Sequence, residues 1–238
     1  RGYFDLIASV DEFILLDDVQ YTKRDWRNRN KIKTMSETKW LTIPVTTKGK
    51  YFQKICETKI SNQEWQSLHW SIIERNYADA KFFNEVSKFI KPIYFDYNWE
   101  SLSKLNRFFI EKILNYLKIE TKISWSWEYY CDGSRSEKLL NLVKSSNAKI
   151  YVSGPSAKSY LDTGIFLKSG IEVKWFNYSK LKSYPQLGNE FISNISIIDL
   201  LMNVGADSIK FLPNVKIKNI YFFLHLISNL NLKFIMVK

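Results

Sequence analysis

A short apolar run that ends in two carboxylates places the strongest constraint on the fold of this chain. Residues Phe13–Leu16 form a continuous apolar stretch, and Asp17 and Asp18 follow it directly. Such a run is typical of a buried strand. Charged groups at the end of a buried strand lie at the edge of a sheet, where open α/β folds usually bind their ligands. We therefore expect an α/β fold with a site near these two carboxylates.

A dense cluster of cationic side chains follows the carboxylates. It is interleaved with Tyr21 and Trp26, and its basic members are Lys23, Arg24, Arg27, Arg29, Lys31 and Lys33. Such a segment can hold an anion, and its rings can stack on a flat group. The connection over 19–37 is long for a bare loop, which favours a functional role. The alternative is a solvated basic loop after a core strand.

The composition bounds the class of protein. At 238 residues the chain is long enough for one sizeable core. No apolar run approaches the roughly 18 residues of a membrane span, and the opening residues Arg1–Phe4 do not resemble a signal peptide. The cysteines, Cys56 and Cys131, are far apart and match no metal-binding spacing. We therefore expect a reduced, cytoplasmic protein with no transmembrane segment and no metal site.

The formal net charge of +11 allows three kinds of anionic partner, namely nucleic acid, a membrane surface or a small substrate. Much of this charge is lysine scattered over predicted helix faces, and residues 23–33 form the only dense cluster. We therefore favour a small anionic substrate and do not expect a nucleic acid partner.

The periodicity of apolar residues predicts alternating strands and helices. Strands are expected over 12–16, 38–45, 149–152 and 171–178, and helices over 61–78, 79–91 (ended by Pro92), 99–117, 134–143 and 196–204. This order predicts a mainly parallel or mixed central sheet flanked by helices, with a helical hairpin insertion around 61–117. We expect a single domain over 1–210. The segment 211–238 lacks clear cap or turn signals and is expected to be a divergent tail.

His69 is a candidate proton carrier. It lies four residues from both Trp65 and Ile73, so helical spacing directs it toward the body of the protein. A histidine titrates near neutral pH and suits general base catalysis. The alternative is a core histidine that is hydrogen-bonded to the backbone.

Asp17 and Asp18 are further candidates. Paired carboxylates at a strand end can act as a base or bind Mg²⁺ together with substrate phosphates. The alternative is a turn in which they pair with Arg24 or Arg27.

A turn of small residues, Ser153–Ser156, follows the strand predicted at 149–152. Gly154 would let the backbone approach a ligand, and the amides of the following helix would favour an anion, with Ser153 and Ser156 as further donors. The alternative is a plain strand-to-helix turn. The sequence contains neither the G-x-G-x-x-G motif nor the P-loop, the two glycine-rich motifs that commonly bind nucleotides.

Several separated motifs resemble those of the WbqC-like protein family of bacteria. They are VDEFILLDDVQYTKRDWRNRNKIK with KWLTIPV, LHW with Tyr77, YVSGPSAKSYLD, GIEVKWFNY, YPQ and ISIIDLLMNVG. The resemblance covers roughly residues 1–205 and implies an α/β fold. The segment that precedes Gly-Tyr-Phe in members has no counterpart here, so we expect an N-terminally truncated member. Members often carry a histidine before Tyr-Pro-Gln, where this chain has Lys180-Leu181-Lys182.

The resemblance implies an intracellular transferase of surface-polysaccharide biosynthesis, since members are often associated with O-antigen or other lipopolysaccharide gene sets. Surface sugars are commonly decorated by acyl or aminoacyl transfer onto amino groups, which requires a nucleotide-linked amino sugar and a donor such as a carrier thioester. His69, Asp17 and Asp18 are then the expected catalytic residues. The expected binding residues are Arg24, Arg27, Arg29, Asn30, Ser153, Gly154, Ser156, Tyr184 and Gln186.

Two other functions stay open. A strand, a polar turn and a basic loop also suit a nucleotidyltransferase-like enzyme that binds a nucleotide with Mg²⁺. A non-enzymatic module could instead use residues 21–33 to stack bases and neutralise phosphates of a nucleic acid.

Overall fold

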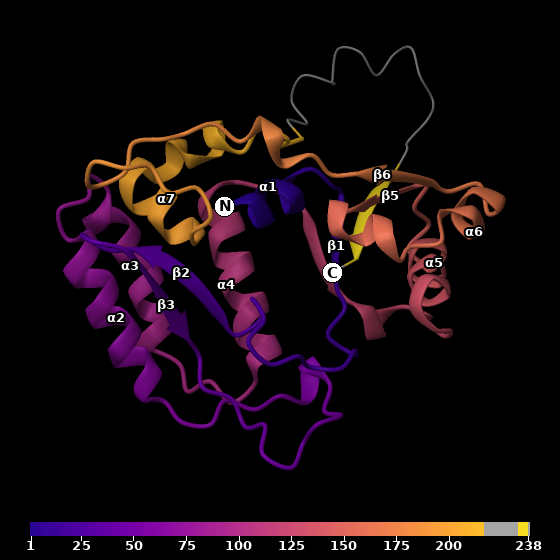
Figure 1. The fold of residues 1–238 in the computed structure, drawn as a ribbon, viewed down its shortest axis with the longest axis horizontal. Coiled ribbons are helices and arrows are strands. Elements are labelled where there is room, and N and C mark those ends of the chain that lie inside the picture. The colour runs from indigo at the N-terminus through magenta and orange to yellow at the C-terminus, as the bar shows by residue number, and fades with distance from the viewer. Residues whose placement is uncertain (217–232, 238) are drawn as a thin grey trace. The chain divides into compact units, whose positions relative to one another are not determined.

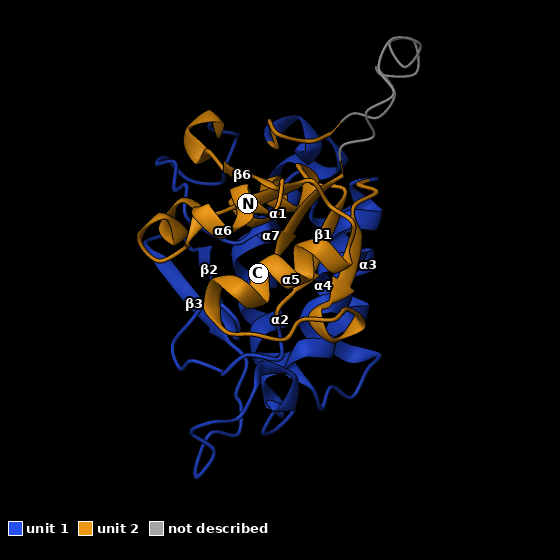
Figure 2. Ribbon diagram, turned by 90° about the vertical axis from the view of Figure 1, so that its right-hand side faces the viewer, with its two compact units in different colours: residues 1, 17–118, 182–211 blue, residues 2–16, 119–181, 212–238 orange. Residues whose placement is uncertain are grey.

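The computed structural model describes residues 1–216 and 233–237 of the chain. Figure 2 shows its two compact units. Unit 1 comprises residue 1 and residues 17–118 and 182–211, and unit 2 comprises residues 2–16, 119–181 and 212–238. The chain therefore passes from unit 2 to unit 1 at Asp17, directly after the predicted first strand.

Unit 2 is built on a five-stranded sheet in which every pairing is parallel. Its strands, in order across the sheet, are β4 (Lys122–Trp125), β1 (Glu12–Leu15), β7 (Phe234–Val237), β5 (Ile150–Ser153) and β6 (Glu172–Trp175). Strand β1 is buried along its whole length because it has a partner on both sides. The structure thus confirms the α/β fold and the buried strand before Asp17.

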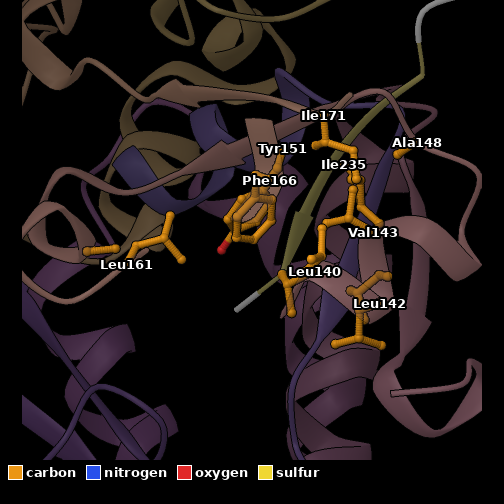
Figure 3. Close-up of a cluster of buried hydrophobic side chains, with 12 residues drawn as sticks. Leu140, Leu142, Val143, Ala148, Tyr151, Leu161, Phe166, Ile171 and Ile235 are labelled. Carbon is orange, nitrogen blue, oxygen red and sulfur yellow. The ribbon is translucent and has the colours of Figure 1, made fainter. Parts of the chain in front are cut away.

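Among the described residues, unit 2 contains the α-helices α1 (Gly2–Ala8), α5 (Arg135–Ser145) and α6 (Thr163–Lys168). Figure 3 shows the cluster of buried side chains that α5 and α6 form with the sheet. At its centre the ring of Tyr151 stacks on that of Phe166, with centroids 5.3 Å apart. The sequence analysis missed α1, whose seven residues are too few to establish a helical period.

Unit 1 contains the hairpin of β2 (Arg29–Lys33) and β3 (Thr38–Thr42), which pair antiparallel. Its helices are α2 (Glu64–Tyr77), α3 (Phe83–Phe95), α4 (Leu102–Tyr116) and α7 (Ile197–Val204), and Figure 1 labels these elements. Helices α2 to α4 occur where the helical region around 61–117 was predicted.

Two expectations about unit 1 were wrong. Strand β2 lies within the segment 19–37, which was expected to be a connection. Its sequence did not predict a strand, because lysine and asparagine are uncommon in strands. The other concerns Pro92, which was expected to end a helix but lies inside the last turn of α3. Only the hydrogen bond to the carbonyl one turn earlier is lost there, so the helix continues to Phe95.

Helix α7 begins and ends as its sequence predicts. The Ser196 hydroxyl accepts a hydrogen bond from Ile198 N, and Gly205 follows the last turn with φ of +64°. A Cβ atom at Gly205 would lie only 2.5 Å from the Phe82 ring, so both the backbone conformation and the packing require glycine.

The predicted divergent tail lies largely outside the described residues. Its described part includes Phe234–Val237, which form β7 between β1 and β5. None of the helices in the described ranges combines the length and the apolar character that a membrane span requires.

A buried carboxylate of β1 joins β4 and the residue that precedes β7 in unit 2. Glu12 is fully buried, and its oxygens lie 3.0 Å from Lys122 Nζ and 2.6 Å from Lys233 Nζ. The hydroxyls of Ser124 and Tyr129 donate to the same carboxylate. Burial by itself would raise the pKa of Glu12, but these ammonium and hydroxyl donors outweigh burial and lower the pKa to about 2.

This ion cluster predicts a loss of stability in acid. Because the pKa of Glu12 falls from 4.5 to about 2 on folding, its stabilisation is complete above about pH 4.5 and is lost as the pH falls toward 2. We expect Glu12→Gln to remove about 3 kcal/mol of this pH dependence, as measured by urea unfolding across that range. The control is Glu74→Gln on the exposed side of α2. Parallel pH curves for wild type and Glu12→Gln would contradict the assignment.

Candidate functional site

A basic depression of about 230 Å³ lies beside the β2–β3 hairpin of unit 1. We use this name for the hollow lined by Tyr21, Lys23, Arg24, Asn28, Arg29, Thr42, Ile43, Pro44, Val45 and Thr47. No carboxylate among its lining residues offsets the three cations. The depression is therefore suited to an anionic group.

Aromatic rings lie beside these cations. The Arg29 guanidinium carbon lies 4.2 Å from the centre of the Trp40 ring, and Lys31 Nζ lies 5.0 Å from it. Trp26 packs against Trp40 with centroids 5.1 Å apart, and 59% of Trp26 stays exposed. Trp26 thus presents an exposed indole beside the hairpin, in contact with the ring that packs on Arg29 of the basic depression, and a flat group could stack on it.

Two buried polar atoms, one on Asn28 and one on Arg29 at the start of β2, have no hydrogen-bond partner among the described residues. Asn28 is 7% exposed, and its amide nitrogen donates to Ile43 O at 2.9 Å while its Oδ1 accepts nothing. The Arg29 Nε atom is also unsatisfied. An unsatisfied buried polar group is costly, so a ligand that completes the hydrogen bonds of these two atoms would gain affinity from them.

The predicted binding residues of the basic segment differ in their surroundings. Arg24 and Arg29 line the basic depression, and Arg24 has the unusual φ of +60° for a residue other than glycine. Arg27 instead pairs with Asp25. The side chain of Asn30 accepts a hydrogen bond from Lys31 N at 2.8 Å and is not part of the lining.

Asp17 is half-buried at the point where the chain enters unit 1 after β1. Burial raises the pKa of Asp17, the Ser103 hydroxyl and the charge of Arg27 oppose this increase, and the neighbouring Asp18 adds to it. The Ser103 hydroxyl donates to the Asp17 carboxylate. A carboxyl whose pKa is raised in this way is a candidate acid or base.

His69 is buried on α2, behind the hairpin. Its Nε2 atom lies 3.1 Å from Thr42 O, and because a carbonyl only accepts, Nε2 carries the proton and donates. The rings of Trp65 and Tyr94 pack at 5.3 and 6.2 Å from the imidazole. Burial lowers the pKa of His69 to about 4, which this hydrogen bond opposes only in part. The imidazole is therefore neutral at physiological pH and supports the strand residue Thr42, which lines the depression.

Tyr184 and Gln186 belong to a buried network around Asp199 of α7. Asp199 is fully buried, and it accepts from Tyr77 Oη at 2.8 Å, Tyr184 Oη at 2.7 Å and Gln186 Nε2 at 2.9 Å. Tyr77 Oη in turn accepts from Lys33 N at 3.1 Å. This network joins β2, α2, α7 and the segment that carries Tyr184, and neither Tyr184 nor Gln186 lines the basic depression.

The small-residue turn lies in unit 2, at the end of β5. Ser153 is 3% exposed, whereas Ser156 is exposed within the short 3₁₀ helix Pro155–Ser159. A Cβ atom at Gly154 would meet nothing within 4 Å, so the turn is open there. An anion site at this turn stays a prediction.

The sequence analysis did not single out Asn28 or Asp199. Asp199 had a visible signal, because it is the only charged residue in the apolar helix Ile197–Val204. A charge at an apolar position of a helix usually has a buried partner. Asn28 had no comparable signal, since its importance depends on a contact with Ile43 across the hairpin. In the described ranges, no three His, Cys, Asp or Glu side chains gather as a metal site.

Comparison with known proteins gives one family and one curated relative. The model of the WbqC-like protein family matches residues 1–211. Uncharacterized protein Rv1507c of Mycobacterium tuberculosis (strain ATCC 25618 / H37Rv) is 48% identical over 208 residues, which cover 87% of this chain and 90% of that protein. No solved structure matches the chain.

The burial of His69 predicts a second pH dependence of stability. Because its pKa falls from 6.5 to about 4 on folding, the stabilisation is complete above about pH 6.5 and is lost as the pH falls toward 4. We expect His69→Gln to lack about 3 kcal/mol of this pH dependence, as measured by urea unfolding at several pH values. If His69→Gln lost stability equally at every pH, the imidazole would not be neutral in the folded state.

The Asp199 network predicts a specific cost for one hydroxyl. Tyr77→Phe leaves an oxygen of Asp199 without its donor and Lys33 N without its acceptor. We expect a loss of about 1–3 kcal/mol in the free energy of unfolding. The control Tyr51→Phe removes a hydroxyl from a ring that is 74% exposed, and it should change stability by less than about 0.5 kcal/mol. Equal effects of the two substitutions would show that the network adds nothing to stability.

Proposed function

The chain belongs to the WbqC-like protein family, and we propose that it is an enzyme that transfers an acyl or aminoacyl group onto a nucleotide-linked amino sugar. In this proposal the product is a precursor of a surface polysaccharide such as an O-antigen. The observation that carries the proposal is the basic depression, with its three cations, its unsatisfied polar atoms and the exposed indole beside it.

The charge of the depression supports a phosphate-bearing ligand. Lys23, Arg24 and Arg29 line it, and no acidic residue is part of the lining. A diphosphate carries charge that ammonium and guanidinium groups bind through short, charge-assisted hydrogen bonds. Arg29 is held in place beforehand, because its guanidinium stacks on Trp40 and donates to Arg24 O. A side chain that is already ordered loses less entropy on binding.

The rings and the amide support the nucleoside and sugar parts of such a ligand. The exposed face of Trp26 offers a stacking surface for a base, and stacking of this kind contributes roughly 1–3 kcal/mol. The unpaired Oδ1 of Asn28 would accept a hydrogen bond from a ligand N–H or O–H. The anionic, aromatic and donor groups of a nucleotide sugar thus each have a counterpart beside the hairpin.

Acyl transfer also requires a proton acceptor. The sugar amine attacks the acyl carbonyl carbon and the carbon–sulfur bond of a thioester donor breaks. The amine proton passes to a base and from it to the departing thiolate, which leaves as the thiol. We assign this role to Asp17, whose pKa is raised by burial. His69 is less suited, since its pKa is about 4 and its Nε2 donates to Thr42. We assign His69 a positioning role, and a direct catalytic role for it stays a prediction.

The binding step is tested by calorimetric titration of the protein with a UDP-linked amino sugar. We expect Arg24→Ala and Arg29→Ala each to weaken binding about tenfold, because each removes a charged hydrogen-bond donor. The matched control is Arg75→Ala, which removes an exposed arginine of α2 outside the depression. Wild-type affinity in both depression variants would refute this site.

The chemical step needs a separate measurement. With a thioester donor present, Asp17→Asn should lower kcat at least tenfold while the dissociation constant for the nucleotide sugar stays within about twofold. Binding of free nucleotide or of single-stranded RNA in preference to the nucleotide sugar would favour a nucleotidyltransferase or a nucleic-acid-binding module instead.

A further inference from the structure

The most exposed aromatic rings of unit 1 lie together at the tip of a loop. Tyr51 is 74% exposed and Phe52 is 82% exposed, and their rings pack edge to face with centroids 5.0 Å apart. We call residues 46–54 the aromatic loop. It protrudes from unit 1 in both views of the chain, as the lowest violet trace of Figure 1 and the lowest blue trace of Figure 2.

The base of the aromatic loop is held by polar contacts. Gln53 is buried. Its side-chain Nε2 donates to Thr46 O at 2.8 Å, and its backbone carbonyl accepts from Tyr21 N at 2.9 Å. Gln20 Nε2 donates to Tyr51 O at 2.9 Å. These bonds fix the loop directly below its tip, so the exposure of the two rings is a feature of the folded protein.

The charges around the tip all have the same sign. Lys48, Lys50 and Lys54 are exposed, and in the described part of the chain none of them has an ion-pair partner. No acidic residue occurs between Glu37 and Glu57. The Glu57 carboxylate is itself engaged, since it accepts from Lys54 N at 2.8 Å.

We propose that the aromatic loop docks on an anionic membrane surface, with Tyr51 and Phe52 at the level of the lipid head groups and the lysines against their phosphates. Aromatic side chains favour the membrane–water interface, and basic residues beside them are attracted to anionic lipid. A protruding tip can enter a fluid interface, whereas a stable protein complex needs about 800 Å² of surface from each partner. The edge-to-face packing of the rings also removes the parallel faces on which successive bases of a nucleic acid would stack.

This inference does not depend on the proposed function. The two surfaces are nevertheless neighbours, because Thr47 belongs to the aromatic loop and also lines the basic depression. Docking through the loop would therefore bring the depression close to the membrane surface.

The test is co-sedimentation of the full chain with phospholipid vesicles. We expect binding to vesicles of phosphatidylcholine mixed with phosphatidylglycerol, little binding to phosphatidylcholine alone, and a marked loss of binding at high salt. Replacing Lys48 and Lys50 by glutamine should lower the partition coefficient about 25-fold, since each lysine contributes about a factor of five. Replacing Tyr51 and Phe52 by serine should lower it about tenfold.

Matched controls distinguish a specific effect of the aromatic loop from a general effect of net charge or of exposed apolar surface. Lys88→Gln with Lys104→Gln removes the same charge from exposed positions of α3 and α4, and Leu167→Ser replaces an apolar side chain that is 78% exposed in unit 2. Both controls should bind vesicles as the wild type does. Absence of binding, equal binding to neutral vesicles, or equal losses in the loop and control variants would each overturn the proposal. Nucleotide-sugar binding by the loop variants is measured in parallel, so that the two proposals fail independently.

Discussion

The burial of one carboxylate determines how unit 1 holds its functional hairpin. Asp199 lies on an otherwise apolar helix and is fully buried, which raises its pKa and would be costly without partners. The hydroxyls of Tyr77 and Tyr184 donate to it, and Tyr77 Oη also receives the backbone N–H of Lys33. Through this chain of bonds the end of β2 is tied to two helices, while its beginning stays available to line the basic depression.

Glu12 and Asp17, two carboxylates close together in the sequence, differ in what surrounds them. Glu12 has two ammonium groups and two hydroxyls around it, so its pKa falls well below the usual value and it is charged at physiological pH. Asp17 has one hydroxyl donor and a partly buried site, and its pKa rises. The first arrangement stabilises the sheet of unit 2, whereas the second suits a group that gains and loses a proton. Glu12 lies on β1 and Asp17 lies two residues after its end, so their position in the chain is similar. What differs is the number of hydrogen-bond donors and the extent of burial around each carboxylate.

The aromatic side chains are also divided by their surroundings. Trp65 and Tyr94 surround His69 and exclude water from it, which keeps the imidazole neutral behind the hairpin. Trp26 and the two rings of the aromatic loop are instead exposed beside cations. Both proposed surfaces, one for a nucleotide sugar and one for a lipid surface, thus combine exposed rings with neighbouring basic side chains.

The α/β fold, the family and the basic segment follow from the amino-acid sequence alone, because they depend on local features. The apolar run before Asp17 is typical of a buried strand, and helical spacing located most of the helices. Tertiary structure decided which residues meet. Asn28 faces the depression because it bonds to Ile43 across the hairpin, and His69 is neutral because rings distant in sequence bury it. Contacts between residues distant in sequence determine the pKa of these groups and decide which buried polar atoms find a partner, so no local sequence pattern predicts either.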